Sequence, residues 1–196
     1  MEFITDEETP KTVMVYGETG TGKSTFINQY CKENGLKPVC LDLANTNRTG
    51  VPRVKLNLNN HIKASLSINN AIDEISKSEE FDTVIIDGYT RLLTLFIGNG
   101  KGLSKYSERG EHFQKLETAL LNSGLNWIVI GQPDMRAKEQ TEDNGESPKP
   151  IISINELVNE QYHCTRKGNQ FFVECEKNRE GKPYEKREVT ERRMRV

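Results

Sequence analysis

Long apolar runs are missing from this sequence. No stretch approaches the ~20 consecutive apolar residues that a membrane-spanning helix needs, and the acidic segment 1–8 does not resemble a basic signal peptide. The 27 lysines and arginines are balanced by 29 aspartates and glutamates. This balance argues against a protein that coats nucleic acid, although it allows a local basic patch. The composition predicts a cytoplasmic protein with no membrane partner.

Zinc-binding patterns are missing as well. The four cysteines (Cys31, Cys40, Cys164 and Cys175) lack the spacing of two to four residues found in zinc sites, and the three histidines are scattered. Cys164 and Cys175 could bridge a hairpin. Free buried thiols in a reducing cytosol are the favoured interpretation.

Apolar runs alternate with helical spacings along the chain. Strands are predicted at 11–16, 37–43, 54–58, 81–87 and 127–130, and a hairpin at 162–166 and 170–176. Helices are predicted at 23–34, at 66–78, at 113–121 and after a capping-box pattern at 153–156. This alternation predicts an α/β fold: a mostly parallel sheet flanked by helices, with an antiparallel hairpin at one edge.

The 196 residues fit one domain with short appendages. We predict a fraying N-terminus at 1–10, a single domain at 11–183 and a charged tail at 184–196 that flanks an exposed strand. Two long polar segments, 98–110 and 133–150, are predicted to be loops.

One segment between the first strand and the first helix carries a specific chemistry. Gly17-Glu18-Thr19-Gly20-Thr21-Gly22-Lys23-Ser24 fits Gly-x₄-Gly-Lys-[Ser/Thr] in full. The glycines let successive amides turn inward around an anion, and the helix start adds the positive end of its dipole. Lys23 can reach the β- and γ-phosphates, Ser24 can ligate Mg²⁺, and Thr25 can bond the α-phosphate.

An apolar strand that ends in a carboxylate completes the pattern. Asp87 follows Val84-Ile85-Ile86, the arrangement in which an aspartate holds Mg²⁺ through water beside the phosphates. No Asn-Lys-x-Asp guanine-reading motif occurs. ATP with Mg²⁺ is therefore the predicted ligand.

These motifs resemble the RecA-type ATPase core, and more narrowly the small phage-encoded core-only RecA-like ATPases (the Sak group). The resemblance covers about residues 11–180 and includes Gln132 after the fourth strand and Lys177-Asn178-Arg179 after the hairpin. It implies that Gln132 senses the γ-phosphate. It also implies that Lys177 and Arg179 reach a neighbouring subunit's γ-phosphate in a ring or filament.

The catalytic base departs from the pattern of this family. RecA-like ATPases usually carry a glutamate just after the second strand, and this sequence has Asp42 there instead, one methylene shorter. Asp42 is the predicted base, and Glu18 is a further candidate. The departure leaves the rate of hydrolysis open, though not nucleotide binding.

The resemblance further implies an ATPase that binds single-stranded DNA along two loops, in recombination or replication in the host cytoplasm. The candidate contacts are Lys101, Lys105 and Arg109 in the first loop and Arg136 and Lys138 in the second. Acidic residues in the second loop also allow ordinary solvated loops. A single-strand-binding or annealing protein is a further candidate partner.

Two other functions stay open at this point. Small-molecule kinases share the length and the phosphate loop, but 133–150 offers only Arg136 as a lid arginine. A binding module that uses nucleotide as a switch, with little turnover, is favoured by the missing glutamate.

Overall fold

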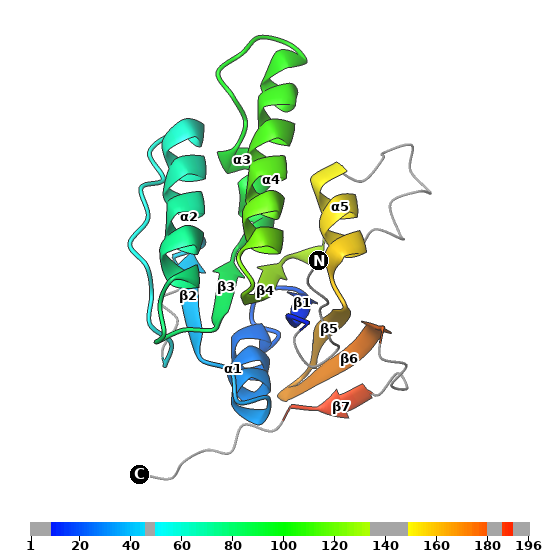
Figure 1. Ribbon diagram of the computed structural model, residues 1–196. Coiled ribbons are helices and arrows are strands. Elements are labelled where there is room, and N and C mark those ends of the chain that lie inside the picture. Colours follow the sequence, from blue (N-terminus) through cyan, green and yellow to red (C-terminus); the bar gives the residue numbers. More distant parts are fainter. Residues whose placement is uncertain (1–8, 46–49, 134–148, 180–185, 190–196) are drawn as a thin grey trace.

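The structure is a computed structural model that describes residues 9–45, 50–133, 149–179 and 186–189 (Figure 1). A seven-stranded sheet runs through it in the order β2-β3-β4-β1-β5-β6-β7. The strands are β1 (Thr12–Tyr16), β2 (Pro38–Asp42), β3 (Thr83–Asp87), β4 (Asn126–Gly131), β5 (Glu160–Lys167), β6 (Gln170–Asn178) and β7 (Lys186–Glu188). The first five are parallel to one another, whereas β6 and β7 are antiparallel additions. The predicted fold class is confirmed.

Helices cover both faces of this sheet. They are α1 (Lys23–Glu33), α2 (His61–Ser76), the 3-10 helix η2 (Tyr89–Arg91), α3 (Leu92–Leu95), α4 (Ser104–Asn122) and α5 (Lys149–Leu157). Figure 1 shows α1 on one side of the sheet and α2, α4 and α5 on the other. No helix within the described ranges is long and apolar enough to span a bilayer.

The hydrophobic core has two parts, one on each face of the sheet, because successive side chains of a strand point to opposite faces. Met14 and Tyr16 of β1 pack toward α2, α4 and α5, whereas Val13 and Val15 pack toward α1. Successive side chains of a strand point to opposite faces, so a strand buried on both faces reads as an unbroken apolar run. This is why these strands could be located from the sequence.

The order of strands sets the geometry of the carboxyl edge. β4 lies between β1 and β3, so one strand separates the loop after β1 from Asp87 at the end of β3. α1 begins directly after Gly22, which has φ 83°, and it ends at Asn34 before Gly35, with φ 67°. The predicted start and stop of this helix are confirmed.

The predicted strand at 54–58 is wrong. The chain makes only an isolated bridge between Arg53 and Cys40 of β2. It then continues beside α2, where the Asn57 N–H donates to the Ser67 hydroxyl at 3.1 Å. Val54, Leu56 and Leu58 are half-buried and alternate with exposed residues. The alternating pattern correctly indicated that one side of the segment is buried. Burial on one side does not require hydrogen bonding to a neighbouring strand.

Three helices begin earlier than predicted. α2 starts at His61, five residues before its predicted start at 66. α4 starts at Ser104, so much of the predicted 98–110 loop is helical and Gly110 lies inside α4, where glycine costs about 1 kcal/mol relative to alanine. α5 starts at Lys149, which places Ser153 inside the helix. Its hydroxyl donates to Glu117 at 2.9 Å instead of capping the helix, so the predicted capping box is wrong.

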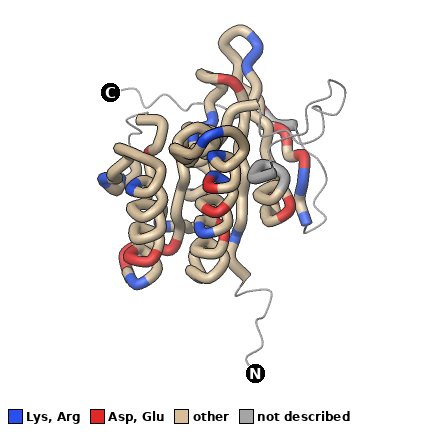
Figure 2. Tube along the Cα trace, turned by 90° about the horizontal axis from the view of Figure 1, so that it is seen from above, with Lys and Arg blue, Asp and Glu red and all other residues tan. Residues whose placement is uncertain are grey.

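Charge is distributed without a dominant sign over the described chain. Figure 2 shows basic and acidic residues interspersed along the helices. Segment 186–188, assigned to a charged tail from the sequence, pairs with β6 as β7. The hairpin of β5 and β6 is confirmed and extends beyond its predicted ends.

Candidate functional site

A cavity of about 450 Å³ opens at the carboxyl edge of the sheet. It lies where the loop after β1 meets the ends of β3 and β4 and the first part of β6. Its walls are Thr19, Gly20, Thr21, Gly22, Lys23, Ser24, Thr25, Ala44, Asp87, Gly88, Thr90, Arg91, Ile130, Gly131, Gln132, Phe171 and Val189. Most of the predicted nucleotide-binding residues therefore line one cavity.

The loop needs its glycines for two different reasons. Gly20 has φ 78° in open space, so its freedom is conformational. Gly17, with φ 150°, lies against β5: a Cβ there would be 2.2 Å from the Cys164 carbonyl oxygen. A Cβ on Gly22 would be 3.2 Å from the Phe171 ring. The strands of the hairpin therefore lie directly against the loop and leave no room for a side chain at Gly17.

Lys23 folds back across the loop. Its Nζ donates to the Gly17 carbonyl at 2.6 Å and to the Glu18 carbonyl at 2.7 Å. Burial lowers the pKa of Lys23, while the carboxylates of Asp87 and Glu18 oppose that shift. The ammonium therefore lies at the loop and within electrostatic range of Asp87.

Ser24 and Asp87 meet the needs of a magnesium ion. Both line the cavity, and Asp87 is only 5% exposed. No cluster of three or more His, Cys, Asp or Glu that could hold a metal occurs in the part of the chain that the structure describes. A hydroxyl and one carboxylate suit Mg²⁺, which keeps several waters and takes substrate phosphate oxygens as ligands.

Gln132 follows β4 and lines the same cavity. Its backbone N–H donates to the Thr90 hydroxyl at 2.9 Å, which fixes the chain where β4 ends. The structure therefore brings Gln132 to the phosphate loop as the sequence predicted. Its role as a γ-phosphate sensor stays a prediction.

A family model described as an AAA domain matches residues 9–161. The chain belongs to this family. The AAA domain is a P-loop ATPase domain, and the match together with the sheet order and the cavity supports nucleotide binding and ATPase activity. No match was found among curated proteins. The narrower resemblance to phage recombination ATPases stays a prediction.

Asp42 is not brought into the triphosphate cavity of the AAA domain. It ends β2 opposite Asp87 in the register of β2 and β3, yet its carboxylate lies 3.4 Å from the Arg53 guanidinium and borders a neighbouring cavity. The Glu18 side chain is absent from the triphosphate cavity as well, although its carbonyl accepts from Lys23. Neither carboxylate is placed to orient water at a phosphate in this conformation.

Lys177 and Arg179 lie at the end of β6 and contact the last turn of α5. Lys177 donates to the Asn155 carbonyl at 2.6 Å, and Arg179 donates to the Glu156 carbonyl. Cations at a helix C-terminus stabilise its unpaired carbonyls. Burial, followed by the neighbouring Arg179 charge, lowers the pKa of Lys177. Neither residue borders the cavity of its own chain.

The predicted DNA contacts separate into two groups. Lys101, Lys105 and Arg109 lie at the connection between α3 and α4 and in the first turns of α4. Lys105 and Arg109 approach the Tyr106 ring, with their charged groups 4.9 and 5.1 Å from its centroid. Arg136 and Lys138 lie outside the described residues.

Sequence reasoning missed eight residues of the AAA domain's cavity: Ala44, Gly88, Thr90, Arg91, Ile130, Gly131, Phe171 and Val189. Arg91 comes four residues after Asp87, the last residue of β3. A basic residue so soon after this strand could have been recognised in the sequence as a candidate for the cavity. Phe171 and Val189 carried no such signal. They reach the loop only because β6 and β7 fold beside α1.

Phe171 gives the cavity an apolar wall suited to a nucleotide base. Its ring packs against Gly22 and is half-buried, and Val189 lies beside it, with its N–H donating to the Phe171 carbonyl at 2.8 Å. The Arg166 guanidinium lies 5.2 Å from the ring centroid. An aromatic ring beside a phosphate loop can contact the base or ribose that the phosphates leave outside the loop.

We expect Phe171→Ala to weaken ATP binding about 5- to 150-fold, because loss of a stacked aromatic costs roughly 1–3 kcal/mol per base. Isothermal titration calorimetry with ATP measures this. Phe172→Ala is the matched control, since Phe172 is half-buried on the same strand but does not line the cavity. Equal affinities for the two variants would contradict a base-contacting role.

Proposed function

We propose that this AAA domain is a magnesium-dependent ATPase that acts with single-stranded DNA in recombination or replication, as a ring or filament. The observation that carries the ATPase part is the convergence of loop 17–25, Asp87 and Gln132 on one cavity. Loop amides and Lys23 would hold the triphosphate, and Ser24 and Asp87 would hold Mg²⁺. When bound, the ion neutralises charge on the phosphate oxygens.

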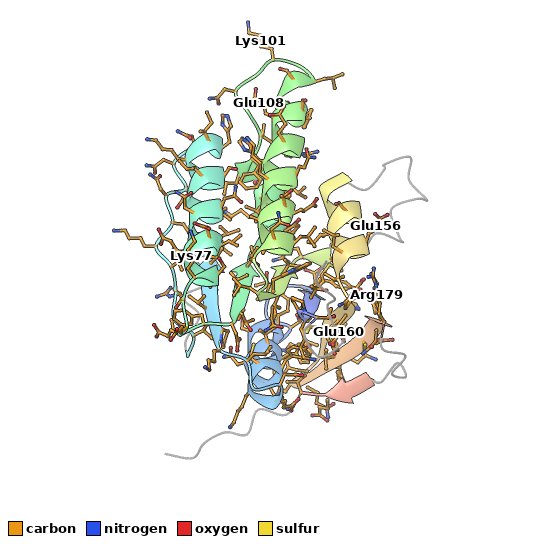
Figure 3. All side chains as sticks on the ribbon, in the orientation of Figure 1. Lys77, Lys101, Glu108, Glu156, Glu160 and Arg179 are labelled. Atoms are coloured by element: carbon orange, nitrogen blue, oxygen red, sulfur yellow. The ribbon has the colours of Figure 1, made fainter. Side chains whose placement is uncertain are left out.

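The DNA contact that we propose is the α3–α4 tip, defined as Lys101, Leu103, Lys105, Tyr106 and Arg109. Figure 3 shows Lys101 projecting away from the body of the molecule at this end. Leu103 is 85% exposed and Tyr106 is 43% exposed. Cations for phosphates beside an exposed aromatic ring for bases suit sequence-independent strand binding.

A short covalent path joins this tip to the nucleotide. Arg91 lines the triphosphate cavity, α3 follows it directly, and the tip begins six residues after α3 ends. Phe96, just after α3, is buried against Phe113 of α4, with ring centroids 5.2 Å apart. Binding of single-stranded DNA at the tip would therefore act on the nucleotide site through this packed connection.

Replacing Lys101, Lys105 and Arg109 together by alanine should weaken oligonucleotide binding and lower its salt dependence. Three lost phosphate contacts reduce the slope of log K against log salt by about two for a single strand. Fluorescence anisotropy with labelled (dT)₃₀ over a salt series measures both quantities. Basal ATP turnover should not change, because none of the three lines the cavity.

The control carries Lys32→Ala, Lys63→Ala and Lys77→Ala, three exposed lysines away from the tip. It removes the same charge. If both triple variants lose DNA affinity equally, the tip is not the contact surface and only net charge matters. If neither loses affinity, the DNA part of the proposal is wrong.

For self-association we propose that Lys177 and Arg179 serve a neighbouring subunit. Both are held at the end of α5, outside their own cavity. Alanine variants should bind ATP normally and lose turnover. Mixing each variant with the Lys23→Ala protein should restore part of that turnover, because one subunit supplies the cations and the other supplies the phosphate loop.

A second candidate function is a nucleotide switch with little turnover, favoured by the position of Asp42. Its carboxylate pairs with Arg53 outside the triphosphate cavity. Tight ATP binding with turnover that stays slow on oligomerisation and on adding DNA would support the switch.

A further inference from the structure

A second cavity, of about 740 Å³, adjoins the first one. It lies between the end of β2, segment 53–58 and η2. Its described walls are Asp42, Leu43, Asn45, Arg53, Val54, Lys55, Leu56, Leu58 and Arg91. Among the predicted site residues, Asp42 borders it, and the proposed ATPase function does not use it.

The charge of this cavity is positive. Arg53, Lys55 and Arg91 line it, whereas Asp42 is the only acidic residue among its described walls. Asp42 is 6% exposed at its side chain and lies 3.4 Å from Arg53, so its charge is already offset there. Arg53 keeps 42% of its side chain exposed. A net positive surface therefore faces the cavity.

The chemistry of the walls suits a phosphate group. Guanidinium groups present planar, paired donors that match phosphate oxygens, and an ammonium adds a compact charge. The remaining described walls are aliphatic or amide, with no aromatic ring for stacking. Recognition here would therefore act on the phosphate itself and not on a base.

Arg91 connects the two cavities. It lines both of them, and its guanidinium donates to the Leu43 carbonyl at the partition between them. Leu43 borders the second cavity and the next residue, Ala44, borders the first. A ligand that draws the Arg91 guanidinium toward the second cavity would therefore move this positive charge away from a triphosphate bound in the first cavity.

We propose that this second cavity is a phosphate-binding site, held by Arg53, Lys55 and Arg91 and coupled to the nucleotide site through Arg91. The phosphate belongs either to a free phosphate-bearing compound or to a nucleic acid backbone. Only the coupling rests on the proposed ATP binding, since the site itself does not involve the phosphate loop. Binding at either site changes affinity at the other by the same factor.

The test uses the full chain carrying Lys23→Ala, which weakens phosphate binding at the first site. This Lys23→Ala protein also carries Lys101→Ala, Lys105→Ala and Arg109→Ala, which remove the charges of the proposed DNA contact at the tip. Two probes are titrated: pyrophosphate by calorimetry and labelled (dT)₁₅ by anisotropy. We expect at least one probe to bind saturably. Adding Arg53→Ala and Lys55→Ala should lower the affinity for that probe at least about tenfold, since charge-assisted hydrogen bonds are lost. Adding Lys63→Ala and Lys77→Ala instead should not.

The two probes separate the sources of the phosphate. Pyrophosphate binding indicates a free phosphate-bearing ligand, and binding of (dT)₁₅ alone indicates a nucleic acid backbone. Lys55→Glu is a second variant, because it reverses a charge at an exposed residue and leaves the Asp42–Arg53 pair intact. This variant should also lower the affinity for the probe that binds at least about tenfold.

Two results would overturn the site: no saturable binding of either probe to the Lys23→Ala protein, or binding that survives both the Arg53/Lys55 and the Lys55→Glu changes. Failure of the ATPase proposal is distinguishable. It would appear as absent ATP binding with an intact phosphate loop, while pyrophosphate or (dT)₁₅ still binds the second cavity.

Discussion

Replacing Lys23 by alanine should abolish ATP turnover and weaken ATP binding about 10- to 100-fold. The Lys23 ammonium already donates to two carbonyls of the loop that would surround the phosphates. Its transfer to phosphate oxygens makes charge-assisted hydrogen bonds worth roughly 1.5–3 kcal/mol each. Charge grows on those oxygens as the phosphoryl group transfers, so turnover should fall further than affinity.

Turnover is measured by phosphate release, and affinity by calorimetry. Lys77→Ala is the matched control, because Lys77 is the exposed C-cap residue of α2 and pairs locally with Asp73 at 2.6 Å. Its turnover should equal that of the unaltered protein. If Lys23→Ala keeps full affinity and turnover, the phosphate loop is not the site of the reaction.

Gly17→Ala should destabilise the fold by about 2–5 kcal/mol. A Cβ at this position would lie 2.2 Å from the Cys164 backbone oxygen, at φ 150°. A positive φ costs an L-residue roughly 1–2 kcal/mol, and overpacking against backbone costs roughly 1–3 kcal/mol. Thermal and urea unfolding measure the loss, and ATP affinity should fall as well because β1 and β5 must move apart at the loop.

Gly35→Ala separates conformational strain from the clash. Gly35 has φ 67° after α1, with no atom within 4 Å of an added Cβ. This variant should lose about 1–2 kcal/mol from strain alone and keep its affinity for ATP. If Gly17→Ala is no less stable than Gly35→Ala, the close approach to Cys164 is not a constraint on the loop.

The sequence predicted the parts of the site that depend on local pattern. Strands buried on both faces read as apolar runs, and β1, β3 and β4 were located in that way. Residues 17–25 are contiguous, and their motif sets the shape of the loop and its turn into α1. Gln132, which was named from the family resemblance, lines the same cavity because the carboxyl ends of parallel strands share one edge of the sheet, and its role stays a prediction.

Features that depend on tertiary contacts could not be predicted. Arg53 reaches Asp42 only because the chain after β2 turns back along the sheet edge. Lys177 and Arg179 meet the end of α5 because β6 passes beside it. Phe171 reaches Gly22 through the pairing of β5 and β6. Each contact joins residues whose distance in the chain gives no periodic signal.

The central claim is that the backbone amides of loop 17–25 bind a triphosphate. Hydrogen–deuterium exchange, followed by mass spectrometry with and without saturating ATP and Mg²⁺, tests it most directly because it reports on those amides. The account predicts slower exchange in peptides covering 17–25, with no change in peptides of α2 between 66 and 76. Unchanged exchange in 17–25 at saturating ATP would contradict it.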